Sequence, residues 1–471
     1  MKIIAILVVF LCCILMFVVR REYKVAMLVL GTVVFPLVSV PFLPLQNANF
    51  VLPLSFLLSE YNNISKLIRN SKRKIVWKLT GIALLMDVIT IIMSPHLHQF
   101  NDIRIFVQSD LFFRYFALLY AFWAFSSETS IKPVLQLTFW GMIVLTTFGV
   151  INYITKSADF VSAMMSGVGQ TGIGATGDEA GSIFAERDRF RVQAMFLNPF
   201  DYGYVCILML ILHIYGYVKK YESKRNFWIV TACAIFGVVF CGCRTNIFCC
   251  LVGVSTFFLL AFKLGKSIKV SLMLVAIGSI CYFYVPSVQE TVDNMMTMFD
   301  KESDVSGSSL ELRTVQYAAV LNHIQDKPLF GCGYRYFWID MGWGQGKEYL
   351  LDRRLAGLEG VVMSYLLERG FVGLFLYFLF YITILVYFIK KRKYAPQTVA
   401  FGVSVLCVYL SFANMTGELN SVYPTILLLG YVFSVVDFNQ LKSTISGGVI
   451  QVLNYILPQF PCRILKTAWV W

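Results

Sequence analysis

The stretch "FWIVTACAIFGVVFCGCRTNIFCCLVGVSTFFLLAFK", residues 227–263, decides the fold class. It contains two apolar runs, 227–243 and 246–263, and each is long enough to cross about 30 Å of hydrocarbon as a helix. Between them stands Arg244. A charge at the centre of a bilayer costs roughly 3 kcal/mol and usually marks a functional cavity. The stretch therefore predicts two membrane-spanning helices joined by a short link that carries a guanidinium.

Similar apolar runs recur along almost the whole chain. Of the 471 residues, 58% are hydrophobic and only 14% are charged, a balance that a soluble domain of this length does not carry. We predict an all-α, polytopic membrane protein with about 12–13 transmembrane helices in a single transmembrane domain, 1–471. The predicted spans are 3–19, 25–44, 49–65, 76–94, 110–127, 133–155, 192–218, 227–243, 246–263, 270–285, 361–389, 398–416 and 421–437.

Basic residues between the spans predict the orientation. They form five clusters, at 20–24, 66–78, 219–225, 263–269 and 390–393. All five fall on one face only if all thirteen spans exist, and the positive-inside rule places that face in the cytoplasm. The N-terminus is then outside and the C-terminus inside. The net charge of +13 is explained by orientation, so we expect no nucleic-acid partner.

Two long connections then lie outside, 156–191 and 286–360. Structureless loops of about 75 residues are uncommon, so the second, which precedes the last three spans, is expected to be partly helical. Ser309 has the character of a helix cap, and apolar residues follow it at helical spacing, which predicts an amphipathic helix on the membrane surface. The tail, 438–471, is broken by prolines and is expected to lie along the cytoplasmic interface.

Metal and cofactor sites are not indicated. Most of the twelve cysteines lie inside apolar runs, where free cysteine behaves as a small hydrophobe. His96 and His98 are two of only four histidines, and no carboxylate pair converges on them. We expect neither a metal nor a cofactor.

Arginines gather on the predicted outer face. Those nearest to membrane spans are Arg191, Arg244 and Arg313, and Arg189 precedes the first of them. Guanidinium groups bind phosphate bidentately and stay charged, so such a cluster beside apolar walls suits a phosphate at the end of a lipid. The alternative is that these arginines snorkel or pair with neighbouring acids, which are Glu186, Asp188 and Glu311.

One further arginine lies inside a predicted span. Arg114 follows Asp110 by four residues, so the two can neutralise each other, and Asp87 of another span is a second possible partner. Arg114 is alternatively a fourth member of the lipid-phosphate site.

Four motifs resemble the O-antigen ligase and O-antigen polymerase superfamily of bacterial membrane glycosyltransferases. In chain order they are "RVQAMFLNPFDYGYVCILML" (191–210), "CGCRTNIFCCLVG" (241–253), "RTVQYAAVLNHIQDKPLFGCGYRYF" (313–337) and "GLEGVVMSYLLERGFVGLFLYF" (357–378). The resemblance implies transfer of a glycan from undecaprenyl diphosphate to a hydroxyl, outside the cytoplasmic membrane and without a metal. It implies that Arg191, Arg244 and Arg313 hold the diphosphate and stabilise its leaving charge, with Arg189, Arg114 and Arg335 as further diphosphate contacts.

The catalytic base differs from the ligase pattern. Ligases carry His-Asn some nine residues before a Glu-x-Gly-x-x-Gly element, which here begins at Glu368. The corresponding position is Glu359, whose carboxylate can still accept the proton of an attacking hydroxyl. Glu359 is alternatively an ordinary loop acid paired with Arg353 or Arg354.

The absence of this histidine favours a polymerase of lipid-linked repeat units for O-antigen, capsule or exopolysaccharide. A ligase that transfers a finished glycan to lipid A core is the second hypothesis, and a flippase of the same lipid is the third. A flippase would be expected to show related halves and a site at mid-membrane, which this chain does not. The expected partners are the lipid-linked donor and acceptor, the bilayer and a chain-length regulator, and the expected location is the bacterial inner membrane with the active site facing outward.

Overall fold

A computed structural model describes the greater part of the chain. The described residues are 2–34, 52, 54–62, 74–98, 103, 106, 128–156, 190–196, 198–262, 265, 282–284, 289, 293, 310–343, 349–355, 358, 360–417, 424–437 and 439–440. Every regular element among them is a helix. Five of these are long and apolar enough to cross a membrane: α7 (Ile131–Thr155), α10 (Pro199–Val218), α12 (Arg244–Ala261), α17 (Val361–Lys391) and α18 (Pro396–Thr416). The prediction of an all-α polytopic membrane protein is confirmed.

Other helices lie in further predicted spans. They are α1 (Lys2–Val18), α2 (Arg21–Val34), α4 (Lys74–Met93), α11 (Lys224–Phe240) and an apolar helix at Pro424–Asp437, here called the final helix. The predicted spans 110–127 and most of 270–285 lie outside the described residues. The full number of spans therefore stays a prediction.

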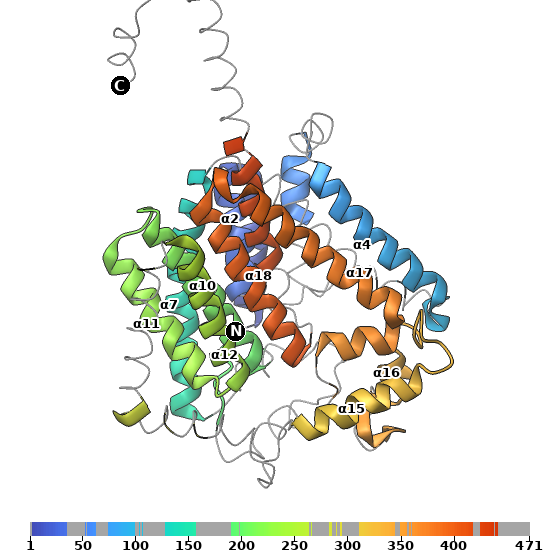
Figure 1. Ribbon diagram of the computed structural model, residues 1–471. Coiled ribbons are helices and arrows are strands. Elements are labelled where there is room, and N and C mark those ends of the chain that lie inside the picture. The colour runs from blue at the N-terminus through green and yellow to red at the C-terminus, as the bar shows by residue number, and fades with distance from the viewer. Residues whose placement is uncertain are drawn as a thin grey trace, which may run out of the picture.

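α10 is the central helix of one group, in contact with α7, α11, α12 and α18 (Figure 1). Its tyrosines bind the neighbouring helices: the Tyr204 hydroxyl lies 2.6 Å from the Thr425 hydroxyl, and that of Tyr215 lies 2.9 Å from that of Tyr431. The span predicted at 192–218 was wrong at its start. Asn198 caps the helix through its side chain and Pro199 follows, so the helix begins there and residues 190–196 approach it without helical structure.

α17 is not the single continuous helix that the sequence predicted. Gly370 has φ 63° and ψ −166°, a conformation essentially restricted to glycine, and it divides the helix in two. In Figure 1 the short first part lies crosswise to the long second part. Residues 328–333 of the long connection fill the break. Four backbone hydrogen bonds of 2.8–3.0 Å join them to α17: Cys332 N–H to Leu367 C=O, Gly333 N–H to Glu368 C=O, Phe371 N–H to Pro328 C=O and Val372 N–H to Leu329 C=O.

Different groups mark the two ends of the bundle. At one end Lys24 and Glu60 form a buried ion pair of 2.6 Å, and Arg392 donates to Leu260 C=O of α12 at 2.6 Å. The other end carries Arg244 and the helix α15 (Leu310–His323), which lies crosswise to α18 in Figure 1. We call this second end the arginine end. Which end faces the outside stays a prediction.

Candidate active site

The helix pair α12 and α18 places Arg244. The two run antiparallel, and the Ser404 hydroxyl of α18 donates to Gly253 C=O of α12 at 2.5 Å. Arg244 lies nine residues before Gly253 and Ala413 lies nine residues after Ser404, and each separation corresponds to a rise of about 13.5 Å. Arg244, the first residue of α12, therefore lies at the level of the last turn of α18.

The turn before Arg244 is held by the start of α10. The Asn246 side chain, fully buried, donates to Phe200 C=O at 3.1 Å and also contacts the Cys241 sulfur at 3.4 Å. Gly203 of α10 packs so closely here that an added Cβ would collide with Asn246. This close packing holds the turn in place and therefore fixes the backbone position of Arg244.

Arg191 reaches the same turn from the segment that precedes α10. Val192 N–H donates to Phe240 C=O at 3.0 Å, which ties this segment to the end of α11. The aliphatic part of the Arg191 side chain lies against Gly242, with Cγ 3.2 Å from the position that a Cβ would take. Gly242 has φ 62° and stands two residues before Arg244. The structure therefore brings Arg191 and Arg244 to one turn.

Arg313 approaches from the long connection. It lies in the first part of α15, and its guanidinium donates to Met415 C=O in the last turn of α18 at 3.1 Å. Gly360 lies against the same turn, because a Cβ there would be 2.7 Å from Asn414 C=O. Chain that directly follows Glu359 thus reaches the helix end that Arg313 contacts. Glu359 itself lies outside the described residues.

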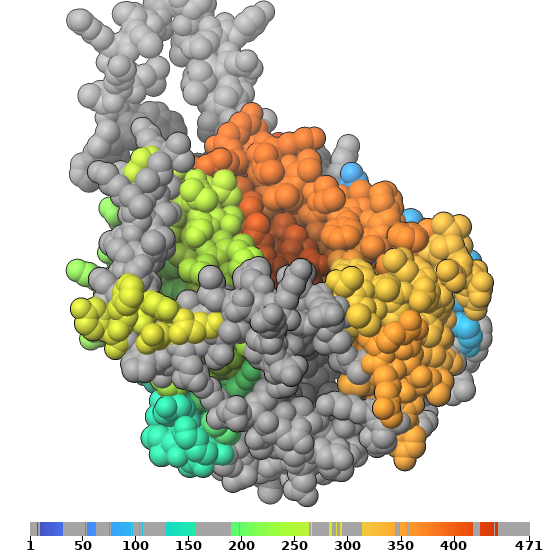
Figure 2. All heavy atoms as spheres, turned by 60° about the horizontal axis from the view of Figure 1, so that its bottom comes forward, coloured from blue at the N-terminus to red at the C-terminus, as the bar shows by residue number. Residues whose placement is uncertain are grey.

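Three half-buried arginines, Arg191, Arg244 and Arg313, therefore lie around the ends of α11, α12 and α18. Figure 2 looks onto this end, with residues of the α15–α16 region on one side of it and α7 on the other. Three guanidinium groups next to apolar helices can bind an anionic group at the membrane surface and stabilise charge that develops on it. This arrangement suits a lipid phosphate better than a neutral ligand.

The other predicted diphosphate contacts are placed differently. Arg335 begins the short helix α16 (Tyr336–Ile339), and its neighbour Tyr334 donates its N–H to Ser94 at the end of α4, at 2.8 Å. The backbone directly before Arg335 is therefore attached to the end of α4. Arg189 and Arg114 lie outside the described residues, as does Asp110, the proposed partner of Arg114. Their roles stay predictions.

An acid, a histidine and an arginine form a separate network in the long connection. Arg354 donates twice to Asp352, with distances of 3.0 Å from Nε and 2.9 Å from Nη2. His323 Nε2 lies 3.0 Å from the same carboxylate. The Arg354 guanidinium, assisted by its backbone N–H and by His323, holds the pKa of Asp352 well below its usual range. Arg354, one of the two suggested partners of Glu359, thus has Asp352 as its bidentate partner.

The sequence reading passed over Arg369, which neighbours the Glu368 that it did single out. Arg369 is 5% exposed, next to the α17 break, and its guanidinium carbon lies 4.6 Å from the centre of the Tyr365 ring and 6.0 Å from that of Tyr334. The sequence could have indicated Arg369, because an arginine inside an apolar run is usually functional, which is the argument applied to Arg244. It was missed because the run was treated as one uninterrupted span.

The class defined by this fold and site is a multi-pass helical membrane protein with an arginine-rich site at one end of its bundle. Residues 229–378 match the family model of the O-antigen ligases. This match confirms the resemblance to the O-antigen ligase and polymerase superfamily, and it indicates a membrane glycan-processing function. It covers Arg244, Arg313 and the broken helix α17 as far as Phe378, which is about a third of the chain. No curated protein matches the chain.

Proposed function

We propose that this protein is a membrane glycosyltransferase that polymerises undecaprenyl-diphosphate-linked repeat units into O-antigen, capsular polysaccharide or exopolysaccharide. The observation that carries the proposal is the convergence of Arg191, Arg244 and Arg313 at one end of the bundle. The charge pattern of the sequence supports an outward orientation of this end in the bacterial inner membrane. The proposed protein partner is a chain-length regulator.

The proposed reaction is a substitution at the anomeric carbon of the donor glycan. The hydroxyl oxygen of the acceptor forms a bond to that carbon, while the bond from the carbon to the diphosphate oxygen breaks. The leaving undecaprenyl diphosphate takes the bonding electrons, and the three arginines stabilise the added negative charge. Glu359 takes the proton of the attacking hydroxyl, so protons and charge balance.

The position of Gly360 supports this role for Glu359. Gly360, the residue after Glu359 in the chain, lies against the last turn of α18, which Arg313 also contacts. Metal is not required in this scheme, because the arginines supply the positive charge that a divalent ion would bring to a diphosphate.

A ligase that passes the glycan to lipid A core is the alternative, and the description of the matching family favours it. The position of Glu359, where ligases carry histidine, is the reason for placing the polymerase first. Both reactions use the same donor and the same arginine site, so only the acceptor separates them.

The test uses purified full-length protein in nanodiscs with lipid-linked repeat units as the only glycan. A polymerase gives a ladder of products on a gel, whereas a ligase gives one shifted band only after lipid A core is added. Absence of both, together with movement of the lipid across vesicle membranes, would replace the proposal with a flippase. Parallel samples with EDTA test metal independence, and a reversible loss of turnover on chelation would contradict it.

A further inference from the structure

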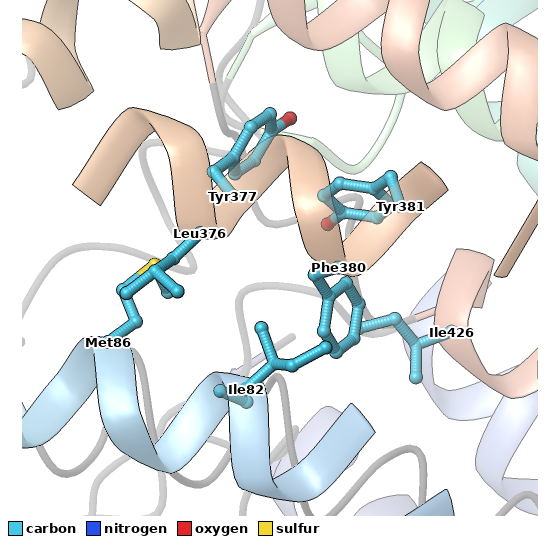
Figure 3. Close-up of a pocket in the computed structure, with 8 residues that line it drawn as sticks. Ile82, Met86, Leu376, Tyr377, Phe380, Tyr381 and Ile426 are labelled. Carbon is cyan, nitrogen blue, oxygen red and sulfur yellow. The ribbon is translucent and has the colours of Figure 1, made fainter. Parts of the chain in front are cut away.

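The core of the bundle is mostly apolar, and one histidine departs from this composition. Where α4 meets α17, Figure 3 shows the ordinary contact, in which Ile82 and Met86 of α4 face Leu376 and Phe380 of α17. His213 of α10, by contrast, is fully buried between α7 and the turn that joins α10 to α11. An ionisable side chain buried in a membrane bundle is costly and usually functional, and the proposed reaction does not use this one.

Two further elements contact the imidazole of His213. Its Nε2 lies 3.1 Å from the Thr138 hydroxyl oxygen of α7, and its Nδ1 lies 2.7 Å from Oε1 of Glu222 in the turn. Lys220, with φ 57°, reverses the chain and brings Glu222 back to the end of α10. The Glu222 side chain is only 4% exposed, so the pair of His213 and Glu222 is shielded from solvent.

The hydrogen bonds indicate where the protons of this pair lie. The Thr138 hydroxyl has one proton and donates it to Val134 C=O at 2.7 Å, so its oxygen accepts from His213. Nε2 of His213 therefore carries a proton. Nδ1 and Oε1 of Glu222 are both acceptors when unprotonated, so their 2.7 Å contact contains a second proton. The pair thus holds one proton more than a neutral imidazole with an ionised carboxylate, and its net charge is zero.

Loss of this proton would leave a net negative charge in a shielded place. Oε2 of Glu222 is also buried and has no hydrogen-bond partner among the residues that the structure describes. A buried carboxylate with so few hydrogen bonds is poorly compensated and destabilises strongly. To bind a deprotonated Nε2, Thr138 would have to turn its proton away from Val134 C=O, which would change the contact of α7 with α10.

The charged groups around the pair are mostly cations. Lys132 of α7 lies 5.4 Å from the centre of the Tyr221 ring, and α2, packed on α7, carries Lys24 with its partner Glu60. α12 and α18 have no ionisable side chain within 252–261 and 396–406, the parts level with His213. The remaining charged residues of α2, of the turn and of the start of α11 are Arg21, Glu22, Lys219, Lys220, Lys224 and Arg225. These cations oppose any positive charge beyond the single extra proton.

The pair is connected to the arginine end through α7, which packs along α10 and α11 (Figure 1). Eleven residues beyond Thr138, or about 16 Å along the helix, Gly149 packs against Tyr202 and Val192, which lie 2.8 and 3.3 Å from the position that a Cβ would take. Val192 directly follows Arg191 in the chain. A shift of α7 at Thr138 would therefore reach the segment that carries Arg191.

We propose that His213 and Glu222 form a buried proton-binding site, and that the bound proton fixes α7 against α10 and thereby positions Arg191. His213 is a positioning residue in this scheme, because it acts through α7. The proton site is independent of the proposed glycan transfer, and only its effect on turnover rests on that function.

Nitrogen NMR tests the proton site without turnover. The chain has four histidines, so a variant with His96→Gln, His98→Gln and His323→Gln, labelled with ¹⁵N-histidine, reports on His213 alone. In lipid bilayers at neutral pH we expect Nε2 to carry a proton and Nδ1 to share one with Glu222. An Nε2 without a proton, or an Nδ1 that makes no hydrogen bond, would overturn the proposal.

A pH profile tests the effect on Arg191. The unfolded chain at neutral pH binds one proton fewer at these two residues, so raising the pH removes the stabilisation that the bound proton provides. We expect kcat/KM of the unmodified protein for the donor to fall at least about fivefold between neutral pH and about pH 9, where lysines still carry their charge. Thermal unfolding at both pH values shows whether the protein stays folded.

Glu222→Gln is the informative variant, because its amide can donate to Nδ1 of a neutral His213 and keep α7 in place without the extra proton. Its kcat/KM should change less than about twofold over the same pH range. Glu22→Gln, at the same end of the bundle, is the matched control and should keep the pH dependence of the unmodified protein. Equal pH profiles of the unmodified protein and Glu222→Gln would overturn the positioning of Arg191.

The outcomes separate this inference from the proposed function. A protonated Nε2 in a protein that forms no ladder would reject the polymerase and keep the proton site. A ladder from a protein whose Nε2 lacks a proton would keep the polymerase and reject the proton site.

Discussion

The α12–α18 pair and the broken helix α17 reach the arginine end in opposite ways. α12 and α18 are each continuous, and α12 begins at Arg244, directly after the turn that fixes the position of this residue. α17 breaks at Gly370, and backbone groups of residues 328–333 make the hydrogen bonds that an intact helix would have made internally. The first arrangement presents charge from a rigid pair of helices. The second attaches the long connection, which contains α15 and Arg313, to α17.

Within a membrane, the backbone can leave the helical path only where other protein groups supply hydrogen bonds to its free N–H and C=O groups. At Gly370 the satisfying protein is the long connection itself, so the fold of that connection and the fold of α17 depend on one another. The α12–α18 pair needs no such help. Chemistry is therefore expected to depend on side chains at the α12–α18 end and on backbone geometry at the α17 break.

The largest effect is expected from Glu359, which directly precedes Gly360 in the chain. Glu359→Gln keeps the shape of the side chain and removes the proton acceptor, so turnover should fall by roughly 10²- to 10⁴-fold. Donor binding, measured by equilibrium titration, should persist because the arginines hold the diphosphate. Glu359→His should restore part of the rate.

Glu22→Gln, at the opposite end of the bundle, is the control for this change. If Glu359→Gln polymerises at the normal rate, Glu359 has no catalytic role, and Glu368 becomes the next carboxylate to test.

The second-largest loss of turnover is expected from a change at Arg244, in the α12–α18 pair. Arg244→Lys retains the charge but loses the two-pronged geometry, so we expect a loss of roughly 10²- to 10³-fold in turnover with normal membrane insertion. Initial rates of ladder formation at saturating substrate measure it. Arg392→Lys provides the matched control, because that arginine contacts the other end of α12. Equal losses in the two variants would show that Arg244 acts only on the stability of the helix.

The third effect tests the α17 break. Gly370→Ala places a Cβ 2.5 Å from the Leu329 carbonyl in a backbone conformation that alanine rarely adopts, so we expect about 1–3 kcal/mol of destabilisation. Thermal unfolding in detergent and protease cleavage within 310–343 measure the loss. Gly81→Ala in α4 meets no atom within 4 Å and should be neutral or slightly stabilising. A Gly370→Ala protein as stable as the Gly81→Ala protein would mean that the break carries no strain.

The smallest effect concerns the Asp352 network, which orders the connection away from both regions. Because the pKa of Asp352 is lowered in the folded protein, the carboxylate stabilises the connection at neutral pH, and this contribution is lost as pH falls below about 4. Proteolysis by an acid-active protease should therefore increase slightly at low pH, and Asp352→Asn should remove the pH dependence. A variant with an unchanged pH profile would assign the effect to other carboxylates.

Hydropathy and charge along the sequence predict the class of fold, which the structure confirms, and the residue types of the candidate site. Apolar runs of membrane-spanning length can be satisfied only as helices, and the alternation of basic clusters divides their connections between two faces. Arg191, Arg244 and Arg313 were recognised because charge beside hydrocarbon is costly and so seldom accidental. These inferences are local, since each needs only the residue and its immediate neighbours in the chain.

Tertiary structure decided what depends on distant segments. Hydropathy could not show that α17 breaks at Gly370, because the hydrogen bonds that permit the break come from residues about 40 positions earlier. The contact of Arg313 with the end of α18, some 100 residues later in the chain, could not be predicted from the sequence either. Periodicity reports which face of a segment is apolar, but only packing determines which segment covers that face and where a gap remains.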